Sequence, residues 1–257
     1  MLKNILLLIF LIFPFSNQLI VAQSFGFGCL GFVGGYGGFV YQNYNAAGLN
    51  EYIRDFNNRE FVNTPVDEFS RSIGFRVGLN FFRATFDNGI ILTAKGFYQY
   101  TDKKNRGSVG VGQNDDNFSI DLDARNWSLG FDVGWELTKV LNWKILDGSL
   151  NFNNITLTET TDLIGSPTDV KKYKSNTGVL GYSIGTGVIL DIFEDYLSIE
   201  GLAGYTYLAI DNVYDDNGTP FLNPVQIPEQ AIWTDSKFID SGGFTAVVQL
   251  NVGFPLL

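Results

Sequence analysis

The sequence predicts an all-β fold: an eight-stranded antiparallel up-and-down transmembrane β-barrel with a short helix in its first long loop. Runs of roughly ten residues alternate between apolar and polar side chains, which is the two-residue period of a strand with two different faces. The chain contains 29 glycines, 23 phenylalanines and 12 tyrosines, a composition typical of strands and tight turns. The connections between the runs alternate between short and long, as in barrels that cross an outer membrane.

The N-terminal segment has the pattern of an export signal. Lys3 supplies a positive charge, residues 5–13 (ILLLIFLIF) supply an apolar segment, and Ala22 is a small residue suited to a cleavage point. The apolar segment is short for a membrane-spanning helix. We therefore expect residues 1–22 to be a cleaved signal peptide and residues 23–257 to form the barrel.

Six runs alternate clearly enough to be assigned as strands. In the run WSLGFDVGWEL, every second side chain from Trp127 to Leu137 is apolar, and the positions between them include Asp132 and Glu136. The other five clear runs are residues 73–81, 90–100, 180–190, 197–207 and 244–254. Two less regular segments, the glycine-rich residues 24–40 and residues 143–158, bring the expected number of strands to eight.

The second irregular segment changes its alternation phase part of the way along. Leu150 and Phe152 share one phase, whereas Ile155 and Leu157 share the other. One extra residue in a strand shifts the alternation by one position. We therefore expect a β-bulge near Asn153–Asn154.

The first long loop contains a helical pattern. Leu49, Tyr52, Ile53 and Phe56 are spaced as i, i+3, i+4 and i+7, so they share one face of a helix. Two interpretations of this face remain open. It packs on the barrel rim or on other loops, or it is a docking surface for a partner subunit or for the lipid interface.

Alternation alone does not distinguish a membrane barrel from a lipocalin-like barrel, whose apolar face points inward. The polar face of these runs is rich in glycine and serine, which suits the narrow interior of eight strands. Aromatic residues lie near the ends of the apolar faces, as in the girdles of a membrane barrel. The expected girdle comprises Tyr98, Tyr100, Trp127, Trp135, Tyr205, Tyr207, Phe244 and Phe254. We therefore expect the apolar face to lie outside, against lipid.

Charged residues on the polar face predict an ion-pair network in the lumen. A charge facing lipid costs roughly 2–4 kcal/mol near the midplane, so these side chains should point inward, where buried charges must pair. The expected network comprises Arg76, Lys95, Asp132, Glu136 and Glu200. Its two interpretations are a structural plug of ion pairs and a gate or proton-linked path.

The glycine-rich first strand, the amphipathic strands and the last strand, GGFTAVVQLNVGFPL, resemble the outer-membrane β-barrel proteins of Bacteroidota, including PorT-like and OmpA/OmpX-type barrels. The resemblance covers the whole mature chain and concerns its architecture. It implies an integral protein of the cell outer membrane, with four long loops outside and both termini on the periplasmic side.

Composition excludes several function classes. A formal net charge of −10 and the absence of a Lys/Arg block argue against nucleic-acid binding. The chain has no histidine, the base or proton shuttle that enzymes on small outer-membrane barrels need, so we expect no enzyme. No cofactor or metal site is expected either, because DNVYDDNG (211–218) has Val213 where a calcium loop needs a ligand.

These observations predict a non-enzymatic outer-membrane protein, surrounded by lipid, whose long loops bind another outer-membrane subunit, surface glycan or another cell. The alternative is a small porin-like conduit for solutes or hydrophobic molecules. Eight strands leave little room for diffusion once their side chains are placed, which argues against the conduit.

Overall fold

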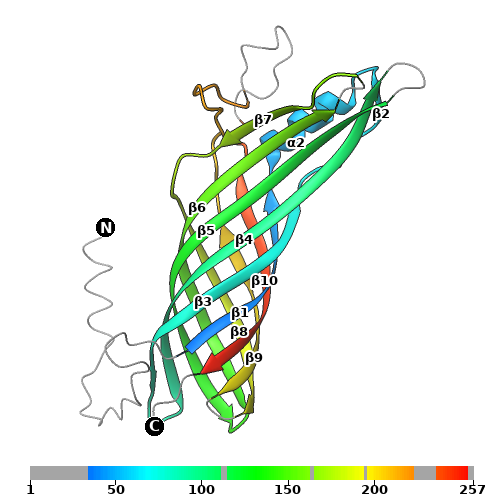
Figure 1. Cartoon of the computed structure of the whole chain (residues 1–257). Helices are drawn as coiled ribbons and strands as arrows, with labels where there is room; N and C mark the ends of the chain where they lie inside the picture. Colours follow the sequence, from blue (N-terminus) through cyan, green and yellow to red (C-terminus); the bar gives the residue numbers. More distant parts are fainter. Residues whose placement is uncertain (1–33, 111–114, 163–164, 194–195, 223–235, 254–257) are drawn as a thin grey trace.

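The computed structural model describes residues 34–110, 115–162, 165–193, 196–222 and 236–253 (Figure 1). The expected signal peptide, the first ten residues of the segment 24–40 and Phe254 lie outside the described residues. The elements are β1 (Gly34–Asn45), α2 (Ala47–Asn57), β2 (Val62–Thr64), β3 (Arg71–Thr85), β4 (Ile90–Gly110), β5 (Asp115–Thr138), β6 (Leu141–Asp162), β7 (Asp169–Lys174), β8 (Val179–Phe193), β9 (Leu197–Tyr207) and β10 (Ser241–Gly253).

Eight strands form a closed antiparallel ring. The order around the ring is β1-β3-β4-β5-β6-β8-β9-β10, and β10 pairs with β1 to close it. Neighbours in the ring are also neighbours along the chain, which is up-and-down connectivity. The short strands β2 and β7 pair with β4 and β6 and are not part of the ring. The predicted eight-stranded barrel is therefore confirmed.

The two ends of the barrel differ in their connections. Tight turns join β3 to β4 at residues 86–89 and β5 to β6 at residues 139–140, and we call this the short-turn end. At the other, long-loop end, β4, β5 and β6 extend far beyond the remaining strands and carry α2, β2 and β7 beside them (Figure 1). The three long strands have 21, 24 and 22 residues, against 12 in β1 and 13 in β10.

The part of the barrel nearer the short-turn end has an apolar exterior and a polar interior. Phe39 is 80% exposed and Trp127 64%, and Leu129 and Phe131 also face outward. On the alternate positions of β5, Ser128 and Asp132 are buried inside the ring. The apolar face is therefore outside, as predicted, and the lipocalin-like arrangement is wrong for this band. Burial of charge inside the narrow ring is possible only with partners nearby.

Along β5 the outward face changes from apolar to polar and the inward face from polar to apolar, while the strand geometry stays the same. On the long-loop side of Trp127, the outward residues become Asp123 and Arg125, while Leu122 and Ile120 are buried inside. The pairing of β5 with β4 stays in register through this whole region, so the alternation itself continues. The barrel thus has an apolar outer band near the short-turn end and a water-facing extension with an apolar interior beyond it.

This reversal corrects the expected bulge at Asn153–Asn154. The pairing of β6 with β5 is continuous there, and Asn153, Ile155 and Leu157 are all buried on the inner side. The change of phase in the sequence is a change in the chemistry of the interior. The true irregularity lies earlier, where the register skips Ile145 and shifts the alternation by one position.

The long-loop end is covered by a compact cap with its own apolar core. The cap consists of α2, β2, β7, the extended parts of β4 to β6, and residues 208–222 and 236–240. Its core contains Tyr44, Ala46, Leu49, Ile53, Phe56, Val66, Phe69, Phe118, Ile120, Leu122, Ile155, Leu157, Leu208, Ile210, Val213, Leu222, Phe238 and Ile239. Within the described part of the chain, no helix is long and apolar enough to cross a membrane.

Asparagine side chains fasten the cap by paired hydrogen bonds to the backbone. Asn50 of α2 donates to the carbonyl oxygen of Phe69 (2.8 Å) and accepts from its amide nitrogen (2.7 Å). Asn57, two turns further along α2, makes the same pair of bonds to Val66. Asn212 does so with Leu222. The buried backbone of these loops is thus satisfied, which fixes their paths.

Candidate functional site

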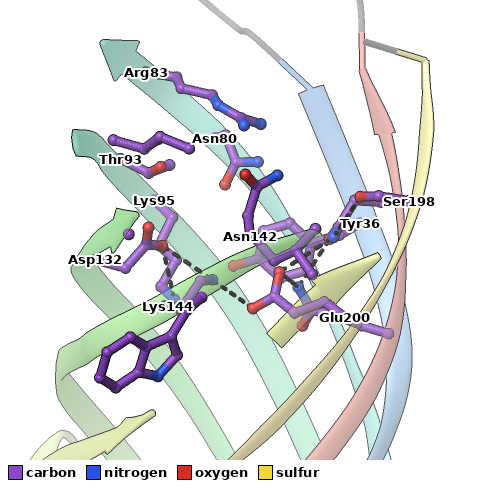
Figure 2. A pocket seen from close by; sticks show the side chains of 16 residues that line it. Tyr36, Asn80, Arg83, Thr93, Lys95, Asp132, Asn142, Lys144, Ser198 and Glu200 are labelled. Carbon is purple, nitrogen blue, oxygen red and sulfur yellow. Dashed lines mark hydrogen bonds and ion pairs between the residues drawn. The ribbon is translucent and has the colours of Figure 1, made fainter. Parts of the chain in front are cut away.

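The interior of the apolar band contains a layer of buried ion pairs, which we call the ion-pair layer. It consists of Lys95, Asp132, Lys144, Asp147 and Glu200. All of these except Asp147 are labelled in Figure 2. The ammonium nitrogen of Lys144 lies 3.1 Å from an Asp132 oxygen and 3.5 Å from an Asp147 oxygen, and it donates to Glu200. Lys95 donates to Asp147 and lies 3.4 Å from Asp132. The sequence-predicted residues Lys95, Asp132 and Glu200 are therefore brought together.

Arg76 is in the lumen but forms no ion pair with any described residue. Its guanidinium donates two hydrogen bonds, of 3.1 and 2.7 Å, to the amide oxygen of Gln99 and lies 4.1 Å from the ring centroid of Phe97. The amide nitrogen of Gln99 in turn donates to Gln42. The expected pairing of Arg76 with Asp132 or Glu136 is wrong, because an amide and an aromatic face hold the guanidinium instead.

Glu136 does not belong to the ion-pair layer. It is exposed, close to the turn that joins β5 to β6, and the described residues give it no ion pair. Glu136 lies four residues beyond Asp132 and therefore on the same face of β5. At that position, however, the strand has already reached the open end of the barrel. The prediction failed because parity gives the face of a strand and not the depth of a residue in the lumen.

Two members of the layer, Lys144 and Asp147, were not among the residues predicted from the sequence. They are three residues apart on β6, so regular alternation would place them on opposite faces. The bulge at Ile145 brings both of them inside. The sequence carried a usable signal: Lys144 and Asp147 would be charges on a lipid-facing strand unless the register shifted between them.

A ladder of neutral polar side chains lines the lumen between the ion-pair layer and the cap. Ser128 and Ser149 both donate to the amide oxygen of Asn151, at 2.7 and 3.0 Å. The amide nitrogen of Asn151 donates to Ser183, which is hydrogen-bonded to Thr206 at 2.9 Å. Thr245 donates to Thr206 from the other side. The polar ladder runs along the inner wall through five neighbouring strands, from β5 to β10.

A small polar cavity of about 40 Å³ lies on the short-turn side of the ion-pair layer. Residues from all eight ring strands line it, including Tyr36 from β1, Asn142 from β6 and Gln249 from β10. Lys95, Asp132, Lys144 and Glu200 also reach its wall, as Figure 2 shows. A volume of this size holds a few water molecules and no larger solute.

The predicted girdle residues lie on the outer surface wherever the structure describes them. Trp127, Trp135, Tyr205 and Phe244 are exposed, and the half-buried residues form ring pairs on the same face. Those pairs are Tyr98 with Trp127 (5.0 Å), Tyr100 with Phe75 (5.7 Å) and Tyr207 with Tyr182 (5.1 Å). Trp127 and Trp135 are eight residues apart, about 26 Å along a strand and about 20 Å along an axis tilted by about 40°.

The predicted helix face packs inside the cap. Leu49, Ile53 and Phe56 are buried in its core, and Phe56 stacks on Phe118 at 4.4 Å. The Tyr52 hydroxyl donates to the Glu159 carboxylate at 2.7 Å. Burial raises the pKa of Glu159 above its usual value, although the hydrogen bond from Tyr52 lowers it. This face is therefore not a free docking surface.

The described residues show no cluster of metal-binding side chains. They contain no group of three or more His, Cys, Asp or Glu side chains that could hold a metal ion. In the 211–218 segment, Asp215 accepts hydrogen bonds from the backbone of Asn217 and Thr219, and Val213 is buried in the cap core. This segment is a closed turn.

Comparison with solved structures finds matches of low sequence identity, among them an attachment protein and a protease of outer membranes. No family model and no curated protein matches the chain. The structure of Ail, the attachment invasion locus protein of Yersinia pestis, in complex with the heparin analogue sucrose octasulfate is 12% identical, with 86% of this chain and 97% of that chain covered and a TM-score of 0.37. The outer membrane protease OmpT of Escherichia coli is 10% identical, with 87% and 94% covered and a TM-score of 0.40. The barrel assignment therefore rests on the strand pairing of this chain.

Proposed function

We propose that this protein is a non-enzymatic integral protein of the outer membrane, with a closed lumen and a rigid cap that binds a partner outside the cell. The observation that carries the proposal is the reversal of chemistry along β5 and β6, from an apolar exterior to an apolar interior. An exterior of Phe, Trp and Leu suits lipid, whereas Asp123 and Arg125 suit water. The band between the two tryptophans of β5 corresponds to the hydrophobic part of a bilayer.

The filled lumen favours a binding protein over a conduit. Three successive layers occupy it: the ion-pair layer, the polar ladder and the apolar core of the cap. A diffusing solute would have to break each of them. The porin-like alternative would need these layers to move together, and the asparagine pairs at Asn50, Asn57 and Asn212 hold the cap in place.

Single-channel recording in planar bilayers tests the closed lumen. The wild-type protein is expected to insert without stable conductance steps, because no continuous aqueous path crosses the layers. Stable steps that change when Ser128 and Asn151 of the polar ladder are replaced by alanine would support the conduit instead.

The cap supplies the binding surface. Its wall has charged residues pointing outward, with Lys104 opposite Asp121 on β4 and β5 and Lys172 opposite Thr158 on β7 and β6. A wall fixed by paired backbone strands presents these groups in constant positions, which lowers the entropic cost of binding. We propose another outer-membrane subunit or a surface glycan as the partner.

Mild-detergent purification from the native cell tests the partner directly. We expect a stable co-purifying subunit or glycan that is lost with Lys172→Glu on the cap. The matched control is Lys139→Glu, an exposed lysine at the short-turn end. If both variants retain the partner, or both lose it, the cap wall is not the binding surface.

The absence of histidine from the whole chain supports a non-enzymatic role. Acyl transfer and hydrolysis on this architecture need a base that titrates near neutral pH, and histidine is the side chain that does so unaided. Deletion of the gene should therefore leave the lipid profile of the envelope unchanged. An altered acylation or phospholipid pattern, restored by the wild-type protein, would contradict this part of the proposal.

A further inference from the structure

Three polar atoms in the wall of the lumen cavity have no hydrogen-bond partner among the described residues. They are the hydroxyl of Tyr36 and the amide oxygens of Asn142 and Gln249. Each residue is more than nine-tenths buried. An unsatisfied buried polar atom costs about 1–3 kcal/mol, so three of them around one cavity indicate a missing partner.

Neighbouring groups fix how the two amides are oriented. The amide nitrogen of Asn142 donates to Asp191 at 2.8 Å, and that of Gln249 donates to Glu200 at 3.2 Å and to Asn251 at 2.9 Å. These acceptors cannot bond an amide oxygen, so the oxygens must face the cavity. The cavity therefore presents two obligate acceptors and one hydroxyl, and its ligand must donate hydrogen bonds.

The charge of the surrounding wall selects a neutral ligand. The ammonium groups of Lys95 and Lys144 are paired with Asp132 and Glu200 in the same wall. Arg83 adds a third positive charge to the wall, so the cavity has no excess of carboxylate that would attract a cation, and the two amide oxygens disfavour an anion. With about 40 Å³ of space, the ligand is the size of one to a few water molecules.

We propose that the short-turn half of the lumen is a water-binding vestibule, which satisfies Tyr36, Asn142 and Gln249 and ends at the ion-pair layer. Ser198 and Asn80, which are half-buried, lie on the side from which water enters. Ser149, buried in the polar ladder beyond the layer, is closed to it. Water thus reaches the ion pairs from one side of the membrane only.

Cysteine labelling tests the vestibule with matched serine substitutions. In a chain whose one cysteine, Cys29, is replaced by serine, Ser198→Cys and Ser149→Cys are treated with a small water-soluble thiol reagent in detergent micelles. Ser198→Cys is expected to react nearly as fast as the exposed control Lys139→Cys. Ser149→Cys should react roughly a hundredfold more slowly, because labelling there requires local opening. Equal rates at the two sites, or no reaction at Ser198→Cys in a folded barrel, would overturn the proposal.

A second measurement distinguishes water from a small cation. The thermal midpoint is compared in sodium, potassium, ammonium and tetramethylammonium chlorides at equal ionic strength, because a bound ion stabilises the folded state. We expect equal midpoints. A rise in one salt that Gln249→Leu abolishes would show a cation site and overturn the proposal. Bilayer conductance reports on the closed lumen separately, so the vestibule and the proposed function can fail independently.

Discussion

Lys144 forms more ion pairs than any other residue of the ion-pair layer. Its side chain is buried, and three carboxylates of the ion-pair layer surround its ammonium group. Replacing it by methionine keeps the volume but leaves the buried carboxylates of Glu200 and Asp132 undercompensated. Removing one partner of a buried ion pair costs about 3–5 kcal/mol.

We therefore expect Lys144→Met to lower the free energy of unfolding by about that amount, with the change seen as a lower urea midpoint in micelles. Lys139→Met, at the exposed turn of the same hairpin, should leave the midpoint unchanged. A variant as stable as the wild type would mean that the ion-pair layer is hydrated well enough to lose a charge.

Glu159 makes a pH-dependent contribution to the cap. Burial raises its pKa in the folded protein, so the folded state binds the proton more tightly than the unfolded state does. The fold is favoured by protonation, and stability falls as pH rises from the unfolded pKa through the folded one. Glu159→Gln keeps an acceptor for the Tyr52 hydroxyl and removes the titration.

We expect Glu159→Gln to flatten the dependence of cap stability on pH above about 4.3, the ordinary glutamate pKa, with its largest gain at neutral pH. Proteolysis rates of the cap, measured across this range, report the effect. Glu60→Gln, on an exposed residue after α2, is the control. A pH dependence identical to that of the wild type would show that Glu159 does not contribute to the pH dependence of cap stability.

At the scale of elements, α2 is the part that completes the cap core. Leu49 is 0% exposed and packs in the core that also contains Ile155 and Leu157 of β6. Leu49→Ala should lower the free energy of unfolding by about 2–5 kcal/mol. The destabilisation should be confined to the cap, because the ring strands keep all their hydrogen bonds. Asp55→Ala on the exposed side of α2 is the matched control.

The expected result for Leu49→Ala is faster amide hydrogen exchange in α2 and in residues 66–69, with β8 to β10 still protected. Uniform loss of protection over the whole barrel would contradict the division into a membrane band and a separately packed cap.

The strand assignments could be predicted because a two-residue period over ten residues is a strong signal. The helix could be predicted for the same reason, since Leu49, Ile53 and Phe56 share one face. The charges of Lys144 and Asp147 indicate a shift between them, but its exact position could not be predicted, because Ile145 and Leu146 are both apolar and either could be the extra residue. The inward turn of Ile155 and Leu157 was misinterpreted because a strand can keep its geometry while its interior changes from polar to apolar.

Of the lumen site, the sequence predicts the members that lie on regular strands. Lys95, Asp132 and Glu200 each alternate correctly and meet in one layer. Arg76 and Glu136 have the right parity but the wrong partners or depth, because those depend on the stagger of neighbouring strands around the ring. Closure of β1 on β10 sets that stagger, and no local pattern contains it.

At the scale of the whole molecule, the central question is where the barrel surface changes from lipid contact to water contact. The surface between Trp127 and Trp143 contacts lipid, and the structure beyond Arg125 contacts water. The three tryptophans among the described residues lie on the outer face, with Trp135 and Trp143 paired across β5 and β6 at the short-turn end. They are natural probes of the claim.

The most direct measurement is fluorescence quenching of variants that keep only Trp127 or only Trp143, reconstituted into vesicles whose acyl chains carry bromine. Both tryptophans are predicted to be strongly quenched, and most strongly by bromine placed near the interfaces. Emission from both variants that is unaffected by brominated lipid, or a folded protein that fails to enter the vesicles, would contradict the claim.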